Sequence, residues 1–232
     1  MRAEAVKEWL LDLVFPKSCL GCNAEGAFLC RSCRETLAFR APQCPRCGRR
    51  NFDGVLCNRC QGKSDLRRFL APFSYREPLA RNLIHAYKYE GLSSLKVFFA
   101  DAIVSFLELY AIRPRPESML VPIPLHRFRE QARGFNQAAL LAEELGRRLD
   151  LGVRSPLYRR RMTEPQIDMP SYDKRRDNVA RAFAVNDPAL VRGRTVILVD
   201  DVATSGATLS EAARVLRRAG ARSVWAIAIA KG

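Results

Sequence analysis

Apolar positions recur at two different spacings along most of the chain, and together they predict an α/β domain. Helical spacing of apolar residues predicts helices over 79–90, from 95 to about 110, over 136–149 and over 208–219. Short apolar runs predict strands over 69–75, 119–124, 194–200 and 223–230. The run over 194–200 is apolar throughout its middle, which is typical of a buried parallel strand. Alternating strands and helices therefore predict a mostly parallel sheet flanked by helices.

The first 62 residues contain all eight cysteines. An apolar patch over 9–15 is interrupted by Asp12 and is followed by no small-residue cleavage site, so it predicts an amphipathic helix rather than a signal peptide. No run approaches the roughly 18 apolar residues of a membrane span. We expect a small cysteine-rich domain over 1–62, a linker over 61–65, a larger domain over 63–232 and a cytoplasmic location.

The cysteines form four pairs with two residues inside each pair, a spacing that suits zinc. The pairs are Cys19 and Cys22, Cys30 and Cys33, Cys44 and Cys47, and Cys57 and Cys60. Each pair makes a turn that supplies two thiolates, so eight thiolates predict two closed, structural zinc sites. Redox CxxC motifs and an iron–sulfur cluster are the alternatives, and four tandem pairs favour zinc. The spacing allows both sequential and cross-braced pairing.

The formal charge of +15 rests on 39 basic residues, of which only seven are lysine. A coding bias towards arginine explains this composition as well as a polyanionic partner does. With eight thiolates and two zinc ions included, the formal charge of residues 1–62 is near zero. Any polyanion bound through net charge is therefore expected on the larger domain.

The segment 195–208 carries the most specific chemistry. An apolar strand leads into Asp200 and Asp201, then into a small hydroxylated turn and a helix. Free backbone N–H groups at such a turn suit a phosphate. Carboxylates at the carboxyl end of a strand suit sugar hydroxyls, which donate hydrogen bonds to them. A phosphate site beside a hydroxyl site predicts recognition of a ribose 5-phosphate unit.

This segment resembles the phosphoribosyl pyrophosphate signature of the type I phosphoribosyltransferases. The resemblance implies that Asp200 and Asp201 are catalytic residues that hold the ribose hydroxyls. It implies that the following turn binds the 5-phosphate through Val202, Ala203, Thr204, Ser205, Gly206, Ala207 and Thr208. It also implies Mg²⁺, bound together with the diphosphate.

Two further segments resemble the ComF family of competence-associated proteins, as do the four cysteine pairs. The first segment is Val121-Pro122-Ile123-Pro124 followed by Arg127, Arg129 and Arg133-Gly134-Phe135-Asn136-Gln137; the second contains Thr163, Gln166, Arg176, Asn178, Ala182 and Phe183. The family comparison implies a pyrophosphate-side loop near 122–133 and a closing loop over 159–181. It makes Arg133 catalytic and Asn136, Gln137 and Arg176 substrate-binding.

Three functional hypotheses follow. The first is a phosphoribosyltransferase with an unidentified acceptor, linked by the family to DNA uptake or utilisation. The second is a non-catalytic protein that binds single-stranded DNA, since Phe128, Phe135 and Tyr172 lie among arginines, although such aromatics are more often core residues. The third is a zinc-ribbon module that docks a DNA-uptake protein. His85 and His126 are expected to be packing or surface residues.

Overall fold

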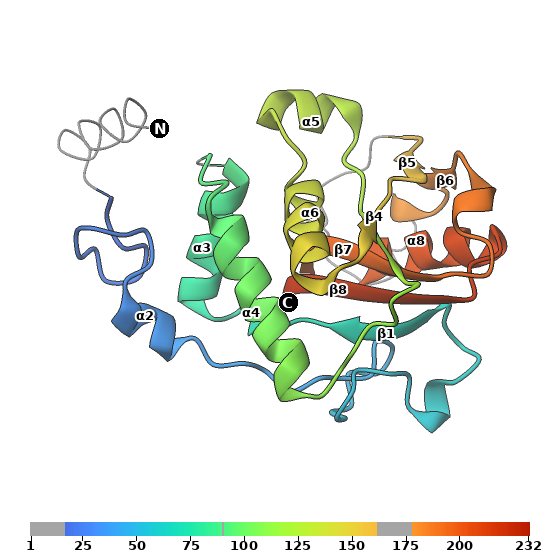
Figure 1. Cartoon of the computed structure of the whole chain (residues 1–232), viewed down its shortest axis with the longest axis horizontal. Helices are drawn as coiled ribbons and strands as arrows, with labels where there is room; N and C mark the ends of the chain where they lie inside the picture. The colour runs from blue at the N-terminus through green and yellow to red at the C-terminus, as the bar shows by residue number, and fades with distance from the viewer. Residues whose placement is uncertain (1–16, 90, 162–177) are drawn as a thin grey trace.

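A six-stranded parallel sheet forms the centre of the computed structural model, which describes residues 17–89, 91–161 and 178–232 (Figure 1). Five strands follow the order β1-β8-β7-β3-β4, and β2 pairs with β8 beyond the end of β1. The strands are β1 Leu66–Leu70, β2 Phe73–Ser74, β3 Met119–Pro122, β4 Gly152–Val153, β7 Thr195–Ala203 and β8 Ser223–Lys231. A separate antiparallel pair joins β5, Leu157–Arg159, to β6, Phe183–Val185. The predicted mostly parallel α/β architecture is confirmed.

Helices cover both faces of the sheet, and the alternation of side chains along β7 shows how. Ile197 and Val199 pack into one core cluster with α3 Pro78–Tyr89, α4 Leu95–Leu109 and α6 Gln137–Leu149. Val196 and Leu198 pack into a second cluster with α8 Ala207–Arg218. Successive strand residues point to opposite faces, so an all-apolar strand must be buried on both. A short helix, α5 Arg127–Arg133, lies above α6 in Figure 1.

Two predicted strands differ from the structure in ways that have physical causes. The strand expected over 69–75 begins three residues earlier and is divided at 71–72 into β1 and β2. Pro72 lacks the N–H that a strand ladder needs, and its carbonyl accepts a hydrogen bond from the Arg40 N–H at 2.8 Å. The strand expected over 194–200 extends to Ala203, because residues 200–203 continue their pairing with β8. Both carboxylates therefore lie within β7, whereas the predicted strand ended at Asp200 and left Asp201 outside.

The cysteine-rich segment packs along one edge and one helix of the larger domain. It contains α2, Arg31–Thr36, and a short 3-10 helix, η1, Asn58–Cys60. Its first half contacts α3, where the Asn82 side-chain amide donates to the Leu20 carbonyl at 3.4 Å. Its second half covers the edge strand β1 through two backbone hydrogen bonds, Leu56 N–H to the Arg67 carbonyl at 2.9 Å and Phe69 N–H to the Gly54 carbonyl at 3.0 Å. A covered edge strand cannot pair with another chain.

Gly54 is required where the second half meets β1. Its φ is +69°, and a Cβ at this position would lie 2.5 Å from the Phe69 carbonyl oxygen. Only glycine fits both the backbone conformation and the close approach. In the described ranges, no helix is both long enough and apolar enough to span a membrane.

Candidate functional site

Two clusters of four cysteines form in the order of the sequence. Cys19, Cys22, Cys30 and Cys33 make the first cluster, and Cys44, Cys47, Cys57 and Cys60 make the second; within each, all Sγ atoms lie within 4.8 Å of one another. A tetrahedral zinc with Zn–S bonds of about 2.3 Å places its sulfurs about 3.8 Å apart. The Sγ atoms of Cys22 and Cys30 are 3.6 Å apart, and those of Cys47 and Cys57 are 3.7 Å apart. The geometry fits two structural zinc sites with sequential pairing, and the cross-braced alternative is excluded.

Backbone amides point at the buried thiols, as the paired turns require. The Cys30 N–H donates to Cys19 Sγ at 3.4 Å, and the Cys57 N–H donates to Cys44 Sγ at 3.5 Å. Burial raises the pKa of Cys19, but backbone N–H donors outweigh it and lower that pKa to about 6. The thiolate form that zinc binds is therefore favoured at Cys19, whereas hydrogen bonding to Cys30 raises the pKa of Cys33 to about 12, so zinc binding must release a proton from that thiol.

Asp200 and Asp201 lie side by side near the carboxyl end of β7 and face different layers. Asp201 continues the face of Ile197 and Val199, where its Oδ1 pairs with Lys88 Nζ at 2.8 Å. Only 16% of the Lys88 side chain and 14% of the Asp201 side chain are exposed, so water screens this pair little. Asp200 continues the opposite face, and its Oδ1 accepts the Asp201 N–H at 2.9 Å.

Asp200 differs from its neighbour in protonation. Burial, followed by the adjacent Asp201 charge, raises the pKa of Asp200 from 3.8 to about 7, against the opposing effects of Lys88 and Arg159. Burial is also the largest influence on the pKa of Lys88, but the attraction of Asp201 outweighs it and raises that pKa. One carboxylate is thus ion-paired while the other sits close to its titration point at neutral pH.

The predicted phosphate turn joins β7 to α8. Gly206 adopts φ +77° at the start of α8, and a Cβ there would meet nothing within 4 Å, so its backbone conformation and not close packing favours glycine. The Ser205 hydroxyl accepts the Ala207 N–H at 3.3 Å. The turn is braced from β8: Lys231 Nζ donates to the Thr204 carbonyl, and the Gly232 N–H donates to the Ala203 carbonyl at 3.0 Å. The turn is therefore held in place next to the two aspartates.

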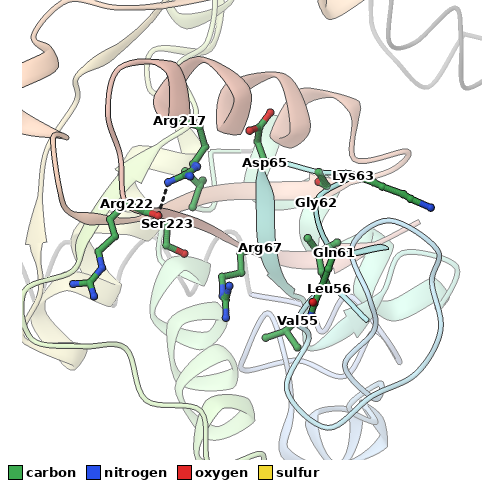
Figure 2. A pocket seen from close by; sticks show the side chains of 12 residues that line it. Val55, Leu56, Gln61, Gly62, Lys63, Asp65, Arg67, Arg217, Arg222 and Ser223 are labelled. Carbon is green, nitrogen blue, oxygen red and sulfur yellow. Dashed lines mark hydrogen bonds between the residues drawn. The ribbon is translucent and has the colours of Figure 1, made fainter. Parts of the chain in front are cut away.

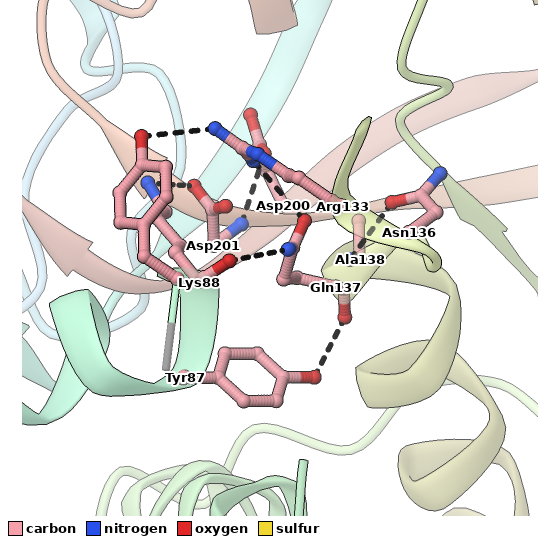
Figure 3. Close-up of polar contacts among 9 residues, drawn as sticks. Tyr87, Lys88, Arg133, Asn136, Gln137, Ala138, Asp200 and Asp201 are labelled. Carbon is pink, nitrogen blue, oxygen red and sulfur yellow. Dashed lines mark hydrogen bonds and ion pairs between the residues drawn. The ribbon is translucent and has the colours of Figure 1, made fainter. Parts of the chain in front are cut away.

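A polar network ties the ends of α3 and α5 to the start of α6 (Figure 3). The buried Tyr87 hydroxyl donates to the Gln137 carbonyl at 2.8 Å, and the Gln137 side-chain amide donates to the Lys88 carbonyl at 3.1 Å. Arg133 donates to the Gln137 side-chain oxygen at 3.2 Å and to the Tyr89 hydroxyl at 2.9 Å. Its guanidinium also lies 4.7 Å from the centre of the Tyr89 ring. The network fixes the helix end that carries Lys88 to Asp201.

Asn136 and Arg159 complete the described surroundings. The Asn136 side chain caps α6 by accepting the Ala138 N–H at 3.0 Å, and it donates to the Ile123 carbonyl at 3.1 Å, which joins α6 to the end of β3. The Arg159 guanidinium lies 5.2 Å from the centre of the Phe183 ring. Burial, then the positive charge of Arg129, lowers the pKa of Arg159, and Asp200 opposes this effect. Arg159 thus lies within electrostatic reach of the aspartate that faces its layer.

The structure brings most of the expected site residues together and adds others. Asp200, Asp201, Gln137 and Arg133 lie together around the carboxyl end of the sheet (Figure 3), and the turn over 202–208 follows the two aspartates between β7 and α8. Arg176, Thr163, Gln166, Tyr172, most of the closing loop expected over 159–181 and the helix expected before residue 17 lie outside the described residues. Lys88 and Tyr87 were not anticipated, because their partners are distant in the sequence and no local motif marks them.

Comparisons with known proteins match both halves of the chain. Residues 10–61 match a double zinc ribbon domain, and residues 132–232 match a phosphoribosyl transferase domain. Competence protein F of Haemophilus influenzae is 31% identical over 217 residues, 86% of this chain and 90% of that protein. DNA utilization protein YhgH of Escherichia coli K12 is 32% identical over 84% of this chain and 87% of that protein, and Competence protein ComFC of Bacillus subtilis is 30% identical over 83% and 79%.

Among solved structures, the glutamine phosphoribosylpyrophosphate amidotransferase of B. subtilis aligns at 16% identity with a TM-score of 0.41. The alignment covers 63% of this chain and 30% of that much longer one. The topology and the two domain matches identify a type I phosphoribosyltransferase fold preceded by a double zinc ribbon.

Proposed function

The chain belongs to the ComF family of competence-associated proteins, and from this premise we propose that it binds phosphoribosyl pyrophosphate and transfers the phosphoribosyl group to an acceptor during DNA utilisation. The observation that carries the proposal is the order of features along β7 and α8. Two carboxylates at the carboxyl end of a central strand lead directly into a braced turn at a helix start. That order places hydroxyl acceptors beside phosphate donors.

The described residues have distinct roles in this proposal. Asp200 and Asp201 accept hydrogen bonds from the ribose hydroxyls, and the turn over 202–208 binds the 5-phosphate through backbone N–H groups and hydroxyls. Because Lys88 pairs with Asp201 at 2.8 Å, a ribose hydroxyl that binds to Asp201 displaces this ammonium. Its charge then offsets the negative charge of the leaving pyrophosphate, together with Arg133.

The donor set also fits Mg²⁺. This ion prefers oxygen ligands and is usually bound by one or two carboxylates together with substrate phosphates, and Asp200 and Asp201 present carboxylate oxygens at one strand end. When bound, Mg²⁺ would supply charge neutralisation on the diphosphate. The chain's own contribution is to position the sugar and to stabilise positive charge at the anomeric carbon through the carboxylates. The bond from that carbon to pyrophosphate breaks, and a bond to a nucleophilic acceptor forms.

Calorimetric titration of phosphoribosyl pyrophosphate with Mg²⁺ into the zinc-loaded protein tests the proposal. We expect one ligand per chain, and we expect Asp200→Asn/Asp201→Asn to abolish its heat of binding. Asp187→Asn is a matched control, because this exposed aspartate caps a short 3-10 helix away from β7. Wild-type protein that fails to bind under these conditions refutes the assignment. Binding that survives in the double variant refutes the role of the carboxylates.

Single-stranded DNA binding is a second candidate, favoured by two exposed aromatic side chains near the site. Tyr89 and Phe128 are 59% and 55% exposed, respectively. Arg133 stacks over Tyr89, and Arg127 lies 5.0 Å from the centre of the Phe128 ring. Aromatic faces flanked by arginines bind unpaired bases. Tyr89→Ala/Phe128→Ala is expected to weaken binding of an oligothymidylate while phosphoribosyl pyrophosphate binding persists; unchanged oligothymidylate affinity argues against this candidate.

We also propose that the domains divide after Gly62 and that the protein works in a reducing compartment such as the cytoplasm. The division is supported by the positive φ of Gly62 between η1 and β1. The location is supported by the eight free thiols, because zinc clusters need reduced cysteines.

A further inference from the structure

A cavity of about 790 Å³ lies at the amino-terminal edge of the sheet (Figure 2). Its walls are formed by the part of the cysteine-rich segment that holds Cys44, Cys47, Cys57 and Cys60 (the second zinc ribbon), by the linker over 61–65, and by the starts of β1 and β8. The lining residues are Val55, Leu56, Gln61, Gly62, Lys63, Ser64, Asp65, Arg67, Arg217, Arg222, Ser223 and Val224. Asp200 and Asp201 lie towards the opposite edge. Asp200 pairs with Ala228 of β8, five residues beyond Ser223, which corresponds to about 16 Å at the usual rise per strand residue. Lys63, Ser64 and Asp65 also line a neighbouring cavity that reaches Ser205 and Ala207 of the phosphate turn, so the cavity at the amino-terminal edge is distinct from the sugar-phosphate site but adjacent to it.

The cavity is strongly cationic. Lys63, Arg67, Arg217 and Arg222 line it, against the single carboxylate of Asp65. Within residues 17–89, 91–161 and 178–232, none of these four cations forms an ion pair. Other arginines of the chain, such as Arg214, do pair with a carboxylate. Unneutralised cations gathered in a concave site concentrate anions.

Two of the polar groups in the wall are already positioned for a ligand. Arg217 donates to the carbonyls of Ala221 and Arg222, which holds its guanidinium beside the start of β8. The Ser223 Oγ is buried and has no hydrogen-bond partner in the described chain. Figure 2 shows Ser223 with Arg67 and Arg222 on either side of it in that view. A buried hydroxyl without a partner is costly, and a bound anion would supply the acceptor.

The lining also indicates the class of anion. It contains no Phe, Tyr or Trp, and sites for unpaired nucleic acid combine cations with aromatic stacking surfaces. The volume falls within the range of small-molecule sites, and the excess of three positive charges matches a compact anion with several charges. We propose that this cavity is a second anion site that binds an oligophosphate, either free or as the phosphate chain of a nucleotide. The second zinc ribbon supplies one wall, so the site depends on zinc loading.

Inorganic tripolyphosphate is the probe that tests the site, titrated calorimetrically into the full zinc-loaded chain carrying Asp200→Asn/Asp201→Asn. This background removes the carboxylates proposed to hold the ribose but keeps the phosphate turn over 202–208, so the arginine variants of the cavity, and not the background, assign tripolyphosphate to it. We expect one tripolyphosphate per chain, with the same affinity as in the wild type. Arg67→Gln/Arg222→Gln is expected to lower the affinity by at least about tenfold, since a hydrogen bond to a charged group contributes about 1.5 kcal/mol or more. Arg49→Gln/Arg154→Gln removes the same charge from exposed positions outside the cavity and should leave binding unchanged.

Asp65→Asn provides a test that misfolding cannot imitate. Removing the only carboxylate of the lining should raise the affinity for tripolyphosphate several-fold. ATP that binds as tightly as tripolyphosphate identifies a nucleotide as the source of the phosphates, and weaker ATP binding identifies the free anion.

Three outcomes would overturn the second site. They are the absence of tripolyphosphate binding, its loss in the Asp200→Asn/Asp201→Asn background, and sensitivity to Arg67→Gln/Arg222→Gln that appears only with an oligothymidylate. None of these depends on whether phosphoribosyl pyrophosphate binds at β7, so failure of one site is distinguishable from failure of the other.

Discussion

Replacing Asp200 with asparagine is expected to stabilise the fold at neutral and alkaline pH, although it removes a residue of the proposed site. Burial and then the charge of Asp201 raise the pKa of Asp200 from 3.8 to about 7. The unfolded chain releases this proton near the ordinary value. Between these two values the folded state keeps a proton that the unfolded state has lost, so stability falls as the pH rises.

The magnitude follows from the width of that interval. The stability associated with the protonated carboxyl is fully present below the ordinary pKa and is lost by about pH 7. Each pKa unit corresponds to about 1.4 kcal/mol, so the change between pH 5 and pH 7 is at most about 2.7 kcal/mol. Asp200 is only half-buried, and solvent screening reduces the expected change to about 2 kcal/mol. Asparagine has no proton to release and lacks this dependence.

Urea unfolding of zinc-loaded wild type and Asp200→Asn, measured from pH 5 to pH 8.5, tests the reasoning. The free energy of unfolding of the variant should increase relative to that of the wild type as the pH rises, and the difference should become constant above pH 7. Asp201→Asn is the contrasting control, because it leaves Lys88 without its partner and should be destabilised at every pH in this range. Parallel curves for Asp200→Asn and the wild type would refute the assigned pKa.

Three further predictions concern other parts of the molecule. Lys88→Met should lower the free energy of unfolding by about 2–3 kcal/mol, because Asp201 is left poorly hydrated without a cation; an unchanged urea midpoint would show that the pair contributes nothing. Cys44→Ser should reduce the zinc content measured by elemental analysis from two ions per chain to one, whereas two retained ions would contradict the cluster assignment. Gly54→Ala should destabilise by more than about 2 kcal/mol, because its Cβ would meet the Phe69 carbonyl, and hydrogen exchange of β1 amides should rise; unaltered exchange would contradict this role.

The regular elements of the larger domain could be predicted because each carries its own periodic pattern. Helices α4 and α6 begin or end within a residue or two of the expected ranges. The end of β7 was harder to predict from the sequence, because Asp200 and Asp201 follow an apolar run and so indicate that the strand ends there. Pairing with β8 continues through both acids to Ala203. Ladder hydrogen bonds depend on the neighbouring strand and not on local polarity.

The zinc clusters were predictable in composition but not in pairing. Cysteines with two residues between them identify half-sites wherever they occur. Which half-sites combine depends on the path of the intervening gaps, and the sequence leaves that path open. In the structure, the turn of α2 brings Cys33 back towards Cys19. The cavity at the amino-terminal edge could not be predicted from the sequence either, because residues that line it, such as Lys63 and Arg222, are separated by most of the chain.

The site itself shows why motif and fold must be combined. Adjacent strand residues point to opposite faces, so Asp200 and Asp201 face different layers. Asp201 forms an ion pair with Lys88, which belongs to α3, and Asp200 interacts electrostatically with Arg159, which belongs to β5. The two carboxylates repel each other even so, and this repulsion helps burial to raise the pKa of Asp200 to about 7; Asp201 is paired with a cation, and Asp200 holds a proton below that pH. A ribose that binds must displace Lys88 from Asp201. As the pH rises past about 7, Asp200 loses its proton and its carboxylate can accept more hydrogen bonds from the ribose hydroxyls. Ligand affinity should therefore depend on pH through Asp200 and on Lys88 through Asp201, two controls that the adjacent letters of the motif do not reveal.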